Sequence, residues 1–144
     1  MASMAALAGS MGALLQGCGG GGSTGTLPSD VPVLPTVNGT AASGAVTVSV
    51  DAGSPLSAVG SAALVQSSSG VFLVAHTGQD AFTAFSAICT HAQCTIIGFV
   101  GSSFVCPCHG SRFSTSGAVQ NGPATRSLRA LSTRVASNVL TISV

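Results

Sequence analysis

Neither lysine nor glutamate occurs in the 144 residues of the chain, so only seven side chains carry a formal charge. The acids are Asp30, Asp51 and Asp80, and the bases are Arg112, Arg126, Arg129 and Arg134. A net charge of +1 gives no basic stripe that could neutralise a phosphate backbone, which argues against nucleic-acid binding. All the bases follow the acids along the chain. This order could polarise the surface weakly, although a set of ordinary solvated charges is the simpler interpretation.

Tryptophan and tyrosine are also absent, and no stretch after residue 22 holds 18 consecutive apolar residues. The body of the chain is therefore not expected to contain a membrane-spanning segment. Its core must be built from valine, leucine, isoleucine and six phenylalanines. The abundance of serine, threonine, valine, alanine and glycine is typical of short strands joined by many turns. The length suits one domain with a modest core.

Residues 1–17, MASMAALAGSMGALLQG, are small, apolar and uncharged. At about 1.5 Å per residue they barely span a membrane core, so a secretory leader fits better than a transmembrane helix, although the usual basic start is missing. The stretch LLQGC resembles a bacterial lipoprotein cleavage site, with Gln16 atypical, and this implies lipidation of Cys18. Residues 18–43 are predicted to form a tether, because GGGGSTGT is flexible and LPSDVPVLP favours extended backbone. We expect a domain that is anchored to a membrane outside the cytoplasm.

From residue 44 to residue 144 the pattern predicts a small antiparallel β-domain. The stretch AVTVSV alternates, with Val46, Val48 and Val50 on one face. Hairpins are expected over residues 71–89, 95–106 and 128–144, with turns near residues 78–80, 101–103 and 136–138. The turn NGP follows the segment 112–119. No long window shows a helical period.

Two loops at predicted strand ends concentrate cysteine and histidine, as CTHAQC at 89–94 and CPCHGS at 106–111. Their C-x-H and C-x-x-H spacings offer two thiolates and two imidazoles, and tetrahedral zinc is the simplest interpretation. A disulfide and an activated thiol nucleophile are the competing ones. If the ligands bring the loops together, Cys94 and Cys108 become neighbours that could form a disulfide. Such a bond would indicate an oxidising compartment.

The two segments resemble the cluster-binding loops of Rieske iron–sulfur proteins, C-T-H-x-G-C and C-P-C-H-G-S-x-Y/F, of the disulfide-containing type of cytochrome bc and b6f complexes. The resemblance extends from about residue 44 to the C-terminus. It includes NGPA, which is similar to the proline loop of the family and contains Gly122 and Pro123. The resemblance implies an all-β Rieske domain, a small antiparallel sandwich or barrel, with one [2Fe–2S] cluster held between two loops at its tip.

Carried onto this sequence, the resemblance implies two ligands for each iron and one disulfide. The implied ligands are Cys89 and Cys106 on one iron and His91 and His109 on the other, with Cys94 bonded to Cys108. Neutral imidazoles in place of two thiolates lower the negative charge of the cluster. Rieske centres therefore lie at about −150 to +300 mV, against about −400 mV for plant-type centres with four thiolates.

Four residues are implied to tune the cluster, namely Ser111, Phe113, Gly122 and Pro123. Ser111 matches a hydroxyl donor to a bridging sulfide, and Phe113 stands where high-potential members carry a tyrosine. Gln93 departs from the usual glycine, which puts the backbone turn of the first loop in question. Ala92 departs from the leucine of quinol-oxidising members. His76 lies away from both motifs and is expected on the surface.

The resemblance favours an extracytoplasmic one-electron carrier that works between redox proteins such as a cytochrome, a reductase or an oxidase. The alternative is the Rieske subunit of a quinol–cytochrome c or quinol–plastocyanin oxidoreductase complex, with quinol as a further partner. The chain would then act as an enzyme only within that complex. A ferredoxin or oxygenase domain is disfavoured, because those proteins resemble this one in ligands but lack the disulfide pair.

Overall fold

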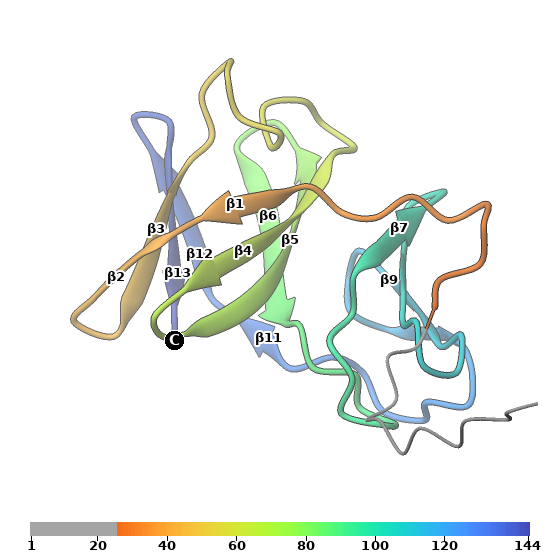
Figure 1. Cartoon of the computed structure of the whole chain (residues 1–144). Coiled ribbons are helices and arrows are strands. Elements are labelled where there is room, and N and C mark those ends of the chain that lie inside the picture. Colours follow the sequence, from red (N-terminus) through yellow and green to blue (C-terminus); the bar gives the residue numbers. More distant parts are fainter. Residues whose placement is uncertain (1–25) are drawn as a thin grey trace, which may run out of the picture.

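The computed structural model describes residues 26–144, and every regular element within them is a β-strand (Figure 1). The predicted all-β fold is confirmed. Nothing in this part of the chain is a helix of the length and apolarity needed to cross a membrane. The predicted leader, residues 1–17, and the lipidation candidate Cys18 lie outside the described residues.

The middle layer of the domain is a five-stranded sheet in the order β1-β4-β5-β6-β11. Its strands are β1 (Thr36–Asn38), β4 (Ala62–Ser67), β5 (Gly70–Gly78), β6 (Ala81–Ser86) and β11 (Ala130–Leu131). All neighbours are antiparallel except β1 and β4, which run parallel. The β5–β6 pair is the first of the predicted hairpins.

A four-stranded sheet in the order β12-β13-β3-β2 packs on one face of this middle layer (Figure 1). Its strands are β2 (Thr40–Ala42), β3 (Ala45–Ser49), β12 (Thr133–Ala136) and β13 (Val139–Ser143). Val46, Val48 and Val50 are all buried in the core between the two sheets, as their alternation predicts. The β12–β13 pair is the predicted C-terminal hairpin.

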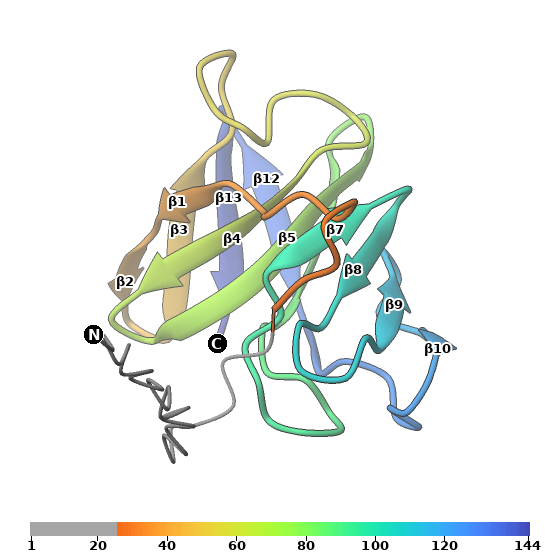
Figure 2. The same ribbon diagram turned by 45° about the vertical axis from the view of Figure 1, so that its right-hand side comes forward.

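A second four-stranded sheet, in the order β10-β9-β8-β7, packs on the opposite face (Figure 2). Its strands are β7 (Gly98–Val100), β8 (Ser103–Val105), β9 (Arg112–Ser114) and β10 (Val119–Asn121). We call this sheet and its connecting loops, residues 87–129, the small lobe. It carries both Cys/His segments.

The middle sheet is covered on both faces, and strand β4 shows how the sequence achieves this. Leu64 faces the core shared with the small lobe, whereas Ala63 and Val65 face the core shared with β3 and β13. A strand buried on both faces reads as a continuous apolar run rather than an alternating one. Each residue of β4 from Ala62 to Val65 is accordingly buried.

The ordered fold begins before residue 44, where the domain was expected to start. Val31 and Leu34 are buried, and the Leu34 N–H donates to the Ile97 carbonyl at 2.7 Å. Strands β1 and β2 then pair with β4 and β3. The proline-containing segment expected as a stiff arm therefore packs against the domain.

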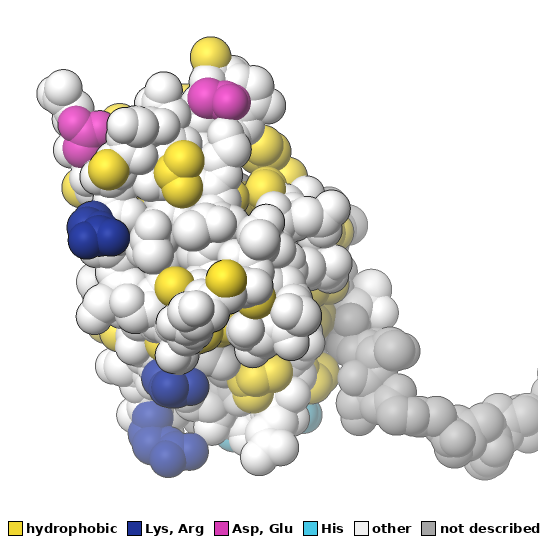
Figure 3. Space-filling model, turned by 90° about the vertical axis from the view of Figure 1, so that its left-hand side faces the viewer, with side chains coloured by type: hydrophobic (Ala, Val, Ile, Leu, Met, Phe, Trp, Pro, Cys, Tyr) yellow, Lys and Arg dark blue, Asp and Glu magenta, His cyan; other side chains and the backbone are white. Residues whose placement is uncertain are grey.

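Acidic and basic side chains are separated on the face of the molecule in Figure 3. The acidic groups lie at its upper end, the basic groups lie lower, and the visible histidine lies at the bottom.

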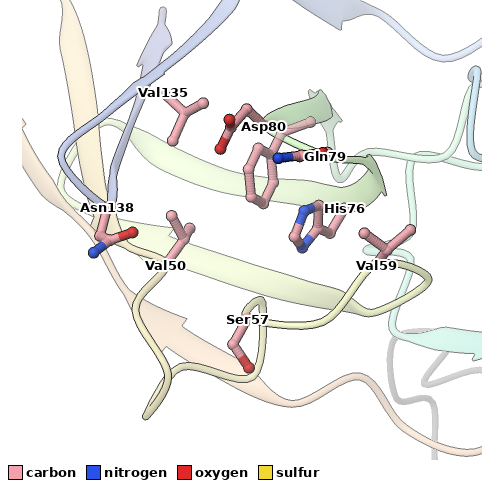
Figure 4. Close-up of a pocket in the computed structure, with 9 residues that line it drawn as sticks. Val50, Ser57, Val59, His76, Gln79, Asp80, Val135 and Asn138 are labelled. Atoms are coloured by element: carbon pink, nitrogen blue, oxygen red, sulfur yellow. The ribbon is translucent and has the colours of Figure 1, made fainter.

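His76 is buried, so its predicted surface position is wrong. Only 9% of its surface is exposed, and its ring stacks on Phe82 at a centroid distance of 4.2 Å. Its Nδ1 lies 2.8 Å from the Leu56 carbonyl oxygen, which requires Nδ1 to be the donor. Figure 4 shows the ring beside a cavity of about 210 Å³ that Val59 and Asp80 also line. Alternation along β5 did not reveal this burial because both faces of the strand are covered.

Candidate metal centre

The first Cys/His loop follows β6 and turns back on itself around Cys89. The Cys89 N–H donates to the Cys94 carbonyl at 2.8 Å, and the Gln93 N–H donates to the Cys89 carbonyl at 3.1 Å. Gln93 has a φ of 56°, a left-handed conformation that a glycine would adopt without steric cost. The loop therefore makes its turn with a glutamine in a glycine-like conformation.

The second loop, between β8 and β9, repeats this hydrogen-bond pattern around Cys106. The Cys106 N–H donates to the Ser111 carbonyl at 2.9 Å, and the Gly110 N–H donates to the Cys106 carbonyl at 3.1 Å. Gly110 also has a positive φ, of 75°. In each loop the backbone of the first cysteine thus bonds to the backbone of the residues four and five positions after it. Cys89 and Cys106 therefore have the same backbone hydrogen-bond pattern.

A disulfide between Cys94 and Cys108 joins the two loops, as the resemblance implies. The Cα atoms of the two residues lie 6.4 Å apart, within the usual range for bridged cysteines. Among the described residues, the cysteines outside this bond are Cys89 and Cys106.

The four candidate ligands form two pairs in different surroundings. Cys89 and Cys106 are each 1% exposed, and their thiols are close enough to hydrogen bond. His91 and His109 are exposed, with ring centroids 4.9 Å apart and ring planes at 90°. Within residues 26–144 no three His, Cys, Asp or Glu side chains gather as ligands for a single ion. Two buried thiols beneath two exposed imidazoles suit a cluster of two irons that takes two protein ligands on each.

Burial is the main cause that raises the pKa of the Cys106 thiol above its ordinary value. The backbone N–H of Cys108 opposes this shift, and the neighbouring Cys89 thiol adds to it. Metal binding to such a thiol has to release its proton.

Two hydrogen bonds connect the loops to the segment around Gly122 and Pro123, whose peptide bond is cis. The Ala124 N–H donates to Ser111 Oγ at 3.0 Å. Thr90 Oγ1 donates to the Arg126 carbonyl at 2.7 Å. Because Ser111 Oγ accepts from Ala124, the Ser111 hydroxyl proton stays available for another acceptor.

Of the four predicted tuning residues, Ser111 and Phe113 are fully buried, whereas Gly122 and Pro123 are exposed. Phe113 belongs to the hydrophobic core that also contains Cys89 and Cys106. Thr90, in the C-T-H motif, has a structural role that the sequence pattern does not indicate. Its bond to Arg126 joins residues 36 positions apart, and no local pattern signals such a contact.

Comparison with known proteins agrees with this geometry. Residues 48–133, more than half of the chain, match the family model of the Rieske [2Fe-2S] domain. The cytochrome b6-f complex iron-sulfur subunit of Synechococcus sp. (strain JA-2-3B'a(2-13)) is 42% identical over 65 residues, which are 44% of this chain and 38% of that subunit. The corresponding subunit of Prochlorococcus marinus (strain NATL1A) is 41% identical over 75 residues, 49% of this chain and 42% of that subunit. The chain thus spans less than half the length of these relatives.

Solved structures give the same result. The crystal structure of the cyanobacterial plasma membrane Rieske protein PetC3 from Synechocystis PCC 6803 matches with a TM-score of 0.57 and 31% identity, over 67% of this chain and 99% of that one. The ferredoxin of carbazole 1,9a-dioxygenase from Nocardioides aromaticivorans IC177 matches with a TM-score of 0.51 and 23% identity, over 67% and 96% of the two chains, and shows the fold alone. The cofactor is one [2Fe–2S] cluster with cysteine and histidine ligation. The chain belongs to the Rieske [2Fe-2S] domain family.

Proposed function

We propose that this protein is a one-electron carrier that exchanges electrons with redox proteins through the small lobe. The observation that carries the proposal is the exposed His91–His109 pair above the buried Cys89–Cys106 pair. When bound, the cluster supplies reversible one-electron chemistry, in a potential range of about −150 to +300 mV for its type. The exposed imidazoles give that chemistry a short path to the surface.

Different residues would ligate the cluster, donate a hydrogen bond to it and hold the two loops together. Cys89 and Cys106 would ligate the inner iron and shield it from water, and His91 and His109 would ligate the outer iron. The Ser111 hydroxyl is oriented by the Ala124 N–H and can donate its proton towards a cluster sulfur. The Cys94–Cys108 bond holds the two loops at a fixed separation.

The ligand assignment is tested by maturing the protein with an iron–sulfur assembly system. Two irons and two acid-labile sulfides per chain are expected, with a rhombic electron paramagnetic resonance (EPR) signal after reduction. Cys89→Ser and Cys106→Ser should each abolish the cluster. One tightly bound zinc and no labile sulfide in the wild-type protein would contradict the proposal.

We also propose an extracytoplasmic location, with the domain tethered to a membrane through the N-terminus. The disulfide supports an oxidising compartment, and the Synechocystis relative is named a plasma membrane protein. If the leader is of the lipoprotein type, the mature chain begins at Cys18 and carries lipid. Cys18→Ala should then block processing or release the protein from membranes, whereas Ser23→Ala should not. An intact Met1 in membrane-bound protein would instead indicate an uncleaved anchor.

A second candidate function is that of a quinol-oxidising subunit, which the similarity to b6-f complex subunits favours. Ala92 counts against it, because the leucine expected beside a quinone is missing. A shift of the reduction potential or EPR spectrum on adding a quinol analogue would support this candidate. The absence of a shift would favour the first candidate function, an electron carrier between redox proteins.

A further inference from the structure

We infer that the surface around the two exposed histidines docks an acidic redox protein, which Arg126, Arg129 and Arg112 attract. This inference rests on the proposed electron-carrier function and adds the chemistry of the partner. We call this surface the docking face.

Arg126 is fixed beside the first loop by its backbone. Its carbonyl accepts the 2.7 Å hydrogen bond from Thr90, the residue between Cys89 and His91. The Arg126 side chain is exposed. The backbone of Arg126 therefore lies beside the loop that carries His91.

The other two arginines are attached to the same region. The Arg129 carbonyl accepts the Ser86 N–H at 3.0 Å, three residues before Cys89, and the Arg129 side chain is exposed. Arg112 follows Ser111 directly at the start of β9 and is half-buried. All three arginines thus belong to the small lobe.

Two of the three acidic groups lie outside the small lobe, whereas Asp30 lies in a turn that packs on its strand β7. Asp80 is in the turn before β6, whose six residues lead towards Cys89 and span about 20 Å. Asp51 follows the buried Val50, at the end where the cavity beside His76 opens. Asp30 is in the turn from Pro28 to Val31, which packs on β7. Figure 3 shows acidic groups at one end and basic groups towards the other.

A few unpaired arginines are enough to influence how a charged partner approaches. Arg112, Arg126 and Arg129 form no ion pair with any residue of the described range 26–144. The chain has no glutamate, so the acids that could offset them are Asp30, Asp51 and Asp80. At 0.1 M salt exposed charges act over about 10 Å, so an arginine within that distance of a docked partner would attract acidic groups on it.

The first loop also carries an exposed apolar side chain just before Cys89. Ile88, next to Cys89, is 46% exposed, although isoleucine is usually buried. Protein interfaces commonly combine an apolar centre with a polar rim, and arginine is enriched in them. A small face of this kind suits a brief encounter between redox proteins. An acidic partner fits its charge, whereas a basic partner would be repelled.

The experiment uses two electron acceptors that differ in charge but share one fold and haem, namely native cytochrome c, which is basic, and succinylated cytochrome c, which is acidic. The full-length, cluster-loaded protein is reduced and mixed with each acceptor in a stopped-flow instrument. At low salt we expect the acidic form to be reduced at least about tenfold faster. The difference should disappear at 0.5 M salt, where screening confines charge effects to a few ångströms.

Matched variants locate the effect. Arg126→Gln and Arg129→Gln should each slow reduction of the acidic cytochrome several-fold. Arg134→Gln removes the same charge from β12, outside the small lobe, and should leave the rate unchanged. EPR spectra and reduction potentials are compared first, so that rates report docking rather than driving force.

Faster reduction of the basic cytochrome, or an equal effect of Arg134→Gln and Arg126→Gln, would overturn the inference. Equal rates with both cytochromes, together with Arg126-dependent binding to phosphatidylglycerol vesicles, would assign the face to a membrane and also overturn it. Failure of the proposed function looks different, because the protein would then lack the EPR signal or reduce neither cytochrome at any salt concentration.

Discussion

Thr90 and Arg126 are joined by a 2.7 Å hydrogen bond from a side-chain hydroxyl to a backbone carbonyl, across 36 residues of sequence. In the second loop the bond runs the other way, and the Ala124 N–H donates to Ser111 Oγ at 3.0 Å. The segment from Gly122 to Arg126 is therefore attached to both loops that carry the proposed ligands. Its position should affect how well a cluster is held.

Thr90→Val is expected to shorten the lifetime of the cluster. Valine keeps the shape of the side chain but removes the donor, at a cost of about 0.5–1.5 kcal/mol. The lifetime is measured as the loss of visible absorbance on warming. Thr133→Val is the control, because Thr133 Oγ1 in β12 donates a bond of similar length, 2.8 Å, to the Phe82 carbonyl, outside the small lobe. Equal losses in the two variants would show that the bond of Thr90 has no special role.

Ser111→Ala should lower both the reduction potential and the stability. The variant loses the hydroxyl proton that can stabilise the reduced cluster, and it leaves the buried Ala124 N–H without its acceptor. An unsatisfied buried group costs about 1–3 kcal/mol. Voltammetry and thermal unfolding measure the two effects, with Ser114→Ala as the control, because the hydroxyl of half-buried Ser114 makes an exposed bond to Ser116. An unchanged potential would mean that the hydroxyl does not reach the cluster.

Gln93 and Gly110 occupy corresponding positions of the two loops, and we expect their substitutions to change the stability in opposite directions. Gln93→Gly should stabilise the protein slightly, because glycine relieves the strain of a positive φ. Gly110→Ala should destabilise it by about 1–2 kcal/mol, because alanine is strained at a positive φ. No atom lies within 4 Å of the added Cβ, so steric clashes should not contribute. Chemical denaturation of the cluster-loaded protein measures both changes. Stabilisation by Gly110→Ala would contradict the described loop geometry.

Phe113→Tyr should raise the reduction potential by some tens of millivolts. A hydrogen bond to a charged group is worth roughly 1.5–3 kcal/mol, and about 1.4 kcal/mol corresponds to about 59 mV for one electron. An upper limit of about 60–130 mV follows, because only the difference between redox states counts. Phe72→Tyr, in the other hydrophobic core, is the control and should not change the potential. A fall in potential on Phe113→Tyr would refute the tuning role.

Replacing both Cys94 and Cys108 by serine should destabilise the protein by about 2–5 kcal/mol and shorten the life of the cluster. The loops would then be held together by hydrogen bonds and the cluster alone. Dithiothreitol provides an internal test, since it should bring the wild-type protein to the behaviour of the variant and leave the variant unchanged. Identical unfolding of wild type and variant without reductant would contradict this prediction.

The predicted hairpins correspond to β5–β6, β7–β8 and β12–β13, because their turns and apolar residues lie close together in the sequence. Strand β4 was not predicted, since a strand buried on both faces lacks the alternation that marks a strand with one wet face. Strand β1 was not predicted either, because it lies in a segment with several prolines and glycines. Its pairing with β4 places Thr36 beside Leu64, which is distant in the sequence. Neither feature has a local signal.

The sequence pattern indicated the candidate ligands because Cys and His are rare in this chain and gather in two short segments. It could not show that Gln93 would adopt the conformation of the glycine it replaces, which depends on the hydrogen bond to Cys89. The burial of His76 was likewise set by residues distant in sequence, through Leu56 and Phe82.

The small lobe leaves and re-enters the middle sheet at a single place. Phe85 pairs with Ala130, and the Ser86 N–H donates to the Arg129 carbonyl, so the two ends of the lobe lie side by side (Figure 2). The lobe can therefore be treated as a removable cassette in an otherwise continuous β-scaffold. Provided that its inner surface stays apolar where it meets Leu64 and Leu73, its loops can be exchanged for those of another metal centre without redesigning the other two sheets.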